Sequence, residues 1–185
     1  ELYSVGFGTK GAGGYAGLDI DLLETLANTG NNGFYHVTEE PTGLDKFFVN
    51  AVAGAVDSEI VVDPVKDIVG GGTEVVNVDL SSQASVVSFV LTWDNPGADL
   101  DLSLIAPGGT RITPANASSF ADRVARETAA AYEILTLHLP LTGSANQEHG
   151  GAWKMEVSNS GSQTVEFSAS AIAESPVNAE SAQPP

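Results

Sequence analysis

After residue 70, apolar residues recur at every second position in a series of short runs. Such alternation puts apolar side chains on one face of a strand and polar side chains on the other. Gly, Pro, Asn and Ser separate the runs, so the pattern predicts an antiparallel β-sandwich. The alternating positions are Val76, Val78, Leu80; Val87, Phe89, Leu91; Leu100, Leu102, Leu104; Ile134, Thr136, His138; Trp153, Met155, Val157; and Val165, Phe167, Ala169.

The first 68 residues have a different pattern. An apolar run at residues 2–9 predicts a strand, and Asp19 is placed to cap a helix that ends at Gly30. A second strand is expected at 33–38 and a second, strongly amphipathic helix at 43–56. Alternating strands and helices predict parallel strands covered by two helices.

We therefore expect an α/β fragment, with parallel strands and two helices, at residues 1–68, followed by an all-β antiparallel jelly-roll sandwich at residues 69–173. The segment 115–131 fits either a helical excursion or a long loop. Residues 174–185 lack apolar periodicity, which predicts a disordered tail.

Charge excludes several classes of partner. Twenty-four Asp and Glu oppose seven Lys and Arg, giving a net charge of −17. Nucleic acids and anionic membranes are poor partners for such a chain, because both are bound largely through Lys and Arg. The acidity is spread evenly along the sequence and supports solubility more than it marks a binding patch. The absence of Cys excludes disulfides and thiol chemistry, and it fits an extracellular protein.

Segments 3–9, 23–30, 33–37 and 44–48 resemble, in order, the C-terminal part of a von Willebrand factor A domain. The Asp-x-Ser-x-Ser metal-binding motif of that family does not occur in this sequence, so no metal site is carried over. The resemblance implies an incomplete domain over residues 1–58, whose remainder would lie in another chain, would have been removed, or would not be included in this sequence.

The second part resembles the P domain of proprotein convertases and the bacterial pre-peptidase C-terminal domain. Residues 90–93, 99–110 (Asp-Leu-Asp-Leu-Ser-Leu-Ile-Ala-Pro-Gly-Gly-Thr) and 150–157 (Gly-Gly-Ala-Trp-Lys-Met-Glu-Val) carry this resemblance. It implies a β-sandwich accessory or adhesion module at about residues 73–173.

Three aspartates in one predicted turn, Asp94, Asp99 and Asp101, are candidate calcium ligands, since calcium takes hard oxygen ligands. Neighbouring carboxylates repel each other unless a cation or hydrogen bonds compensate. An exposed acidic edge, or aspartates bonded to backbone amides, is the alternative interpretation and the one that we favour. Calcium is the candidate cofactor.

Other candidate groups favour ordinary structural roles. Trp93 and Trp153 alternate with apolar residues, which favours core packing over a carbohydrate platform. His36, His138 and His149 occur in no zinc motif, and no Gly-x-Ser-x-Gly nucleophile motif is present.

These observations predict a non-catalytic extracellular or cell-surface binding or adhesion module. Its expected partner is a protein or polymer ligand, or a neighbouring chain that completes residues 1–68. One alternative is an accessory domain of a secreted hydrolase, and another is a structural subunit of an extracellular assembly. No run of 18 apolar residues occurs, so membrane insertion is not expected.

Overall fold

The structure, a computed structural model, describes residues 3–7, 10–11, 14–15, 18–29, 34–38, 58–141 and 149–174. The chain divides into two compact units, Glu1–Asp57 and Ser58–Pro185. The second unit holds the larger part of the described residues, and it is an antiparallel β-sandwich, as the alternation predicted.

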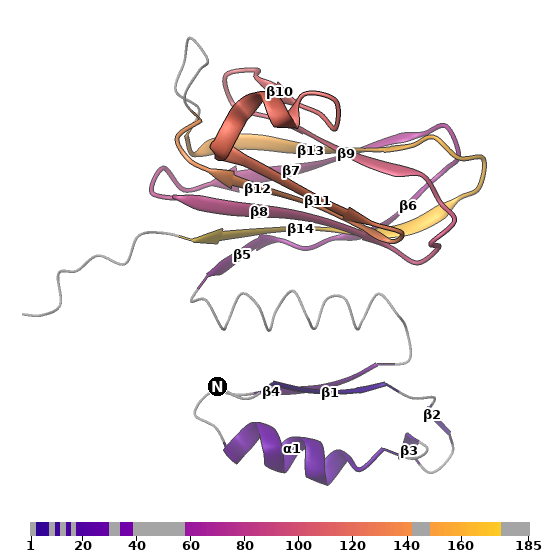
Figure 1. Cartoon of the computed structure of the whole chain (residues 1–185). Coiled ribbons are helices and arrows are strands. Elements are labelled where there is room, and N and C mark those ends of the chain that lie inside the picture. The colour runs from indigo at the N-terminus through magenta and orange to yellow at the C-terminus, as the bar shows by residue number, and fades with distance from the viewer. Residues whose placement is uncertain are drawn as a thin grey trace, which may run out of the picture. The chain divides into compact units, whose positions relative to one another are not determined.

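Two facing sheets build this sandwich (Figure 1). The four-stranded sheet has the order β10-β9-β13-β7, and the larger sheet has the order β11-β12-β8-β14-β5, with β6 also paired to β14. The strands are β5 (Glu59–Val62), β6 (Val65–Ile68), β7 (Thr73–Leu80), β8 (Val86–Trp93), β9 (Leu100–Ile105), β10 (Arg111–Ile112), β11 (Val124–Ala129), β12 (Tyr132–His138), β13 (Gly151–Asn159) and β14 (Val165–Glu174).

The core lies between the two sheets and follows the alternation in the sequence. Every second residue of β8 is buried, and β9 and the central part of β13 alternate in the same way. Phe89 of the larger sheet and Trp153 of the smaller one meet with ring centroids 5.8 Å apart. Burial of such large side chains supplies most of the driving force for the sandwich.

In β12 the predicted inward-facing residues, Ile134, Thr136 and His138, are on the wrong face. In β12 the buried positions are Glu133, Leu135 and Leu137, whereas His138 is exposed and Ile134 is only partly buried. A shift of one residue moves every side chain of a strand to the other face. The run therefore places an acidic residue, Glu133, in the core.

The ambiguous segment 115–131 contains a short helix and a strand instead of a long loop. A 3₁₀ helix covers Ala117–Arg123, and β11 follows directly as an edge strand. All residues of β11 after Val124 are exposed, which explains why this strand has no alternating pattern in the sequence.

In the first unit, β1 (Tyr3–Phe7) pairs in parallel with β4 (Phe34–Thr38), and α1 (Ile20–Thr29) lies between them in the sequence. The short strands β2 (Lys10–Gly11) and β3 (Gly14–Tyr15) form a separate antiparallel pair. Asp19 caps α1 as predicted, because its Oδ1 accepts a hydrogen bond from the Leu22 N–H at 2.9 Å.

The predicted fold class, an α/β fragment of parallel strands with two helices ahead of the sandwich, is nevertheless wrong. The described chain is mostly an antiparallel β-sandwich of two sheets, with one α-helix of ten residues in the described part. Residues 59–68, assigned to the α/β part, form β5 and β6 and pair antiparallel with β14. The predicted second helix at 43–56 and the tail after Glu174 lie outside the described residues.

The chain divides after residue 57 instead of after residue 68 because of these two strands. The sequence of a short apolar strand such as β5 does not indicate which sheet the strand joins. Within the described residues, no helix is long and apolar enough to cross a membrane.

Candidate functional site

A cavity of about 240 Å³ opens at one end of the sandwich. It lies between the end of β8, the following loop and the start of β9 on one side, and the hairpin of β11 and β12 on the other. We call it the Trp93 cavity. Its walls are formed by Trp93, Pro96, Ala98, Asp99, Leu100, Asp101, Arg126, Thr128, Ala129, Ala130, Tyr132 and Glu133.

A buried ion pair lies in the wall of this cavity. Glu133 is 1% exposed, and its Oε1 accepts a hydrogen bond from the Arg126 Nε–H at 2.6 Å. Its second oxygen, Oε2, accepts from the backbone N–H of Leu102 at 3.0 Å. The carboxylate therefore joins the larger sheet to the smaller one, and both of its oxygens are hydrogen-bonded, as a buried charge requires.

The sheet topology explains why a carboxylate is needed at this point. The short strand β10 pairs only with Leu104 and Ile105 of β9, so within the described residues the first half of that edge of β9 has no neighbouring strand. The Leu102 N–H faces this edge, and the side chain of Glu133 satisfies it. Main-chain groups alternate in direction along a strand, so Leu100 presents its N–H and C=O to the same edge, beside the cavity.

Backbone hydrogen bonds hold the loop between β8 and β9 in place. Asn95 Oδ1 accepts from the Gly97 N–H at 3.0 Å, and the Asn95 carbonyl accepts from the Ala98 N–H at 2.8 Å. The Asp99 carbonyl accepts from the Ser160 N–H at 2.9 Å, which ties the loop to the turn after β13. The cavity is thus built on fixed backbone, which favours a defined binding geometry.

The two tryptophans differ in their polar contacts. Trp153 is fully buried, and its Nε1–H donates to the His149 carbonyl at 2.8 Å, so the predicted core role is confirmed. Trp93 is 6% exposed and also belongs to the core, yet it borders the cavity. Its buried Nε1 has no hydrogen-bond partner among the described residues. An unsatisfied buried donor is unusual in a native structure and often marks a functional position.

The predicted calcium ligands do not form one cluster. Asp99 and Asp101 both line the Trp93 cavity, whereas Asp94 is exposed and is not part of its wall. Within the described ranges, no group of three or more His, Asp or Glu side chains is placed to hold a metal ion. Calcium binding by Asp94, Asp99 and Asp101 remains a prediction.

The histidines lie elsewhere. His138 and His149 are exposed at the ends of β12 and of the segment before β13, and His36 lies in β4 of the first unit. None of them belongs to the wall of the Trp93 cavity.

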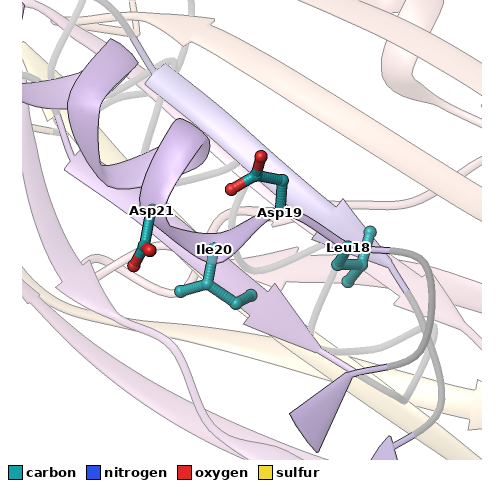
Figure 2. A pocket seen from close by; sticks show the side chains of 4 residues that line it. All are labelled: Leu18, Asp19, Ile20 and Asp21. Atoms are coloured by element: carbon teal, nitrogen blue, oxygen red, sulfur yellow. The ribbon is translucent and has the colours of Figure 1, made fainter.

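A second cavity, of about 470 Å³, adjoins the start of α1 in the first unit. Leu18, Asp19, Ile20 and Asp21 line it, and Figure 2 shows the two carboxylates pointing in different directions. Asp19 is already engaged as the helix cap. This cavity has no described cation or aromatic side chain in its wall and is a weaker candidate site.

Reasoning from the sequence identified Asp99 and Asp101 but missed Arg126, Tyr132 and Glu133. The signal for Glu133 was present, since it alternates with Leu135 and Leu137 in a strand whose other face is more polar. Arg126 carries no such signal, because β11 is an exposed edge strand.

Comparisons with known proteins show only distant likeness. No family model and no curated protein match the chain. The Yersinia pseudotuberculosis-derived mitogen aligns with a TM-score of 0.41 and 17% identity, over 66% of this chain and 92% of that chain. The Clostridium perfringens CspB protease aligns with a TM-score of 0.43 and 10% identity, over 85% of this chain and 38% of the protease chain. Neither likeness carries a conclusion about activity, and the resemblance of residues 1–58 to an A domain receives no support.

Proposed function

We propose that this chain is a non-catalytic binding module of an extracellular or cell-surface protein, and that the Trp93 cavity holds part of its protein or polymer ligand. The observation that carries this proposal is the composition of the cavity wall. Aromatic, acidic and basic side chains meet there beside an unsatisfied indole N–H, on a backbone fixed by hydrogen bonds. Binding sites typically combine apolar walls with a few fixed polar groups.

The buried carboxylate of the same wall has a structural role. Both oxygens of Glu133 are engaged, one by the Arg126 Nε–H and the other by the Leu102 N–H. A general base has to be within reach of a proton on the substrate, and a carboxylate with both oxygens occupied is poorly placed for that role.

A screen by nuclear magnetic resonance tests this proposal. The full ¹⁵N-labelled chain is titrated with small probes of several classes: monosaccharides, amino-acid amides and short carboxylates. We expect at least one class to shift the indole signal of Trp93 and the amide signals of Asp99, Asp101 and Tyr132. The indole signal of Trp153 serves as an internal control, because that group is buried and bonded to His149. Shifts confined to other regions, or the absence of any saturable shift, would contradict the proposal.

A further inference from the structure

We infer that the Trp93 cavity recognises a basic side chain, Lys or Arg, of an extended peptide segment in a partner protein. This inference rests on the proposed function and names the chemistry of its ligand. Four observations support it: the uncompensated charge of the cavity, the aromatic groups in its wall, its size, and the open strand edge beside it.

Charge is the first observation. Three carboxylates and one guanidinium line the cavity, which gives a formal charge of −2. Arg126 is paired with the buried Glu133 at 2.6 Å, and in the described part of the chain no ion pair joins it to Asp99 or Asp101. Among the described residues, neither of these aspartates has an ion-pair partner, and the whole chain has only seven Lys and Arg. A cation that compensates the two carboxylates is therefore best supplied by a partner.

Aromatic groups are the second observation. Trp93 and Tyr132 both line the cavity, and Tyr132 is 38% exposed. The face of an exposed aromatic ring attracts cations, and Tyr132 is the more exposed of the two, since Trp93 is only 6% exposed. Long basic side chains also have apolar stems that pack against such rings while the charged end stays near water. A wall of two aromatic residues with two carboxylates beside them fits this amphipathic shape.

Size is the third observation. At about 240 Å³ the cavity is smaller than the roughly 300–1,000 Å³ of common small-molecule sites. One extended side chain fits such a volume better than an oligosaccharide or a large cofactor does.

The fourth observation favours a peptide over a free amine. Among the described residues, no strand pairs with the edge of β9 at Leu100, and the main-chain groups of Leu100 face that edge beside the cavity. The Leu102 N–H on the same edge is already bonded to Glu133, so the main-chain groups of Leu100 are the ones open to a partner. A peptide segment in extended conformation can hydrogen-bond to such an edge while placing a side chain in the adjoining cavity. This arrangement supplies main-chain affinity together with a preference for a basic residue.

The test compares three pentapeptides that differ only at the central position, Gly-Gly-Lys-Gly-Gly, its norleucine counterpart and its glutamate counterpart, all acetylated and amidated. Each is added to the full ¹⁵N-labelled chain at low salt, and the Trp93 indole and Arg126 Nε–H signals are followed. We expect a saturable shift with the lysine peptide, and no saturable shift with the norleucine or glutamate peptide. Norleucine keeps the apolar stem and lacks the charge, so this pair isolates the charge.

The variant Asp99→Asn with Asp101→Asn should raise the dissociation constant for the lysine peptide about tenfold, because two partly exposed ion pairs are lost. Asp79→Asn, an exposed aspartate on β7 that is not in the cavity wall, should leave it unchanged. Equal binding of the lysine and norleucine peptides, or an unchanged constant in the double variant, would overturn the inference.

Two further probes distinguish failure of this inference from failure of the proposed function. If galactose or calcium chloride shifts the cavity signals and the lysine peptide does not, the inference is wrong and the binding function stands. If no probe shifts these signals, both are wrong.

Discussion

Arg126 Nε–H donates a 2.6 Å hydrogen bond to Glu133 Oε1, from a side chain that is 31% exposed to one that is 2% exposed. Arg126, near the surface, thus compensates the negative charge of Glu133 inside the β-sandwich. Glu133 in turn satisfies the Leu102 N–H of the opposite sheet. Arg126, Glu133 and Leu102 are therefore linked next to the Trp93 cavity. The stability of the fold thus depends on side chains that also line the proposed ligand site.

Removal of Arg126 should therefore be costly. We expect Arg126→Met to lower the free energy of unfolding by about 1–3 kcal/mol, below the usual cost of breaking a buried pair because Arg126 is partly exposed. Denaturant unfolding measures the change. Glu133→Gln in the same background should restore most of the loss, since the neutral amide still accepts from the Leu102 N–H.

Arg111→Met provides the matched control, because the Arg111 and Glu156 side chains are 47% and 23% exposed. Its cost should stay below about 1 kcal/mol. Equal losses in the Arg111 and Arg126 variants would show that burial of Glu133 does not govern the strength of its ion pair.

The sandwich could be predicted because most of its strands bury one face and therefore alternate. The strands that escaped prediction lack that signal: β11 is exposed after Val124, and β5 belongs to the sheet only through its pairing with β14. The site followed the same rule. Asp99 and Asp101 lie next to a turn that residues 95–97 (Asn-Pro-Gly) mark in the sequence, at the start of β9. Arg126, in contrast, reaches Glu133 through a hairpin register that no local pattern specifies.

The turn before β7 should not tolerate a side chain at Gly70. A Cβ atom there would lie 2.6 Å from the backbone carbonyl oxygen of Ser162, closer than real contacts allow. Because backbone cannot move aside as a side chain can, we expect Gly70→Ala to destabilise the protein by roughly 2–4 kcal/mol. Gly97→Ala is the control, since its nearest neighbour is the Asn95 side-chain oxygen at 3.3 Å. Thermal melting of both variants tests the difference, and similar melting temperatures would refute the close approach.

Asn159 should be among the most sensitive polar residues. It is 2% exposed, and its side chain donates to the carbonyls of Gln163 and Ile68 at 2.8 and 3.3 Å and accepts from the Gly161 N–H at 2.9 Å. Asn159→Ala leaves these backbone groups without their partner, at a cost of about 2–3 kcal/mol. Asn77→Ala, at an exposed position of β7, should change stability by less than about 0.5 kcal/mol. Denaturant midpoints that fall equally in both would contradict this role.

Salt should stabilise the folded protein. With a net charge of −17, the carboxylates repel one another more strongly in the compact state than in the extended chain. Added salt screens this repulsion, since the Debye length falls from about 10 Å at 0.1 M to about 3 Å at 1 M. We expect the melting temperature to rise between 0.05 and 1 M sodium chloride (roughly the range over which screening becomes complete). Potassium chloride should act alike, because the effect is one of ionic strength. A flat or falling melting temperature would show that repulsion is not the dominant electrostatic effect.

The two tryptophans should respond differently to replacement by phenylalanine. Both changes remove similar volume from buried positions, but only Trp153 loses a hydrogen bond, the one from its Nε1–H to the His149 carbonyl. Trp93 Nε1 has no partner in the described structure, so Trp93→Phe removes a donor that is already unsatisfied. We therefore expect Trp153→Phe to cost about 1–2 kcal/mol more than Trp93→Phe in denaturant unfolding. The reverse order would mean that the Trp93 indole N–H has a stabilising partner, and the argument for a ligand group at that position would then fail.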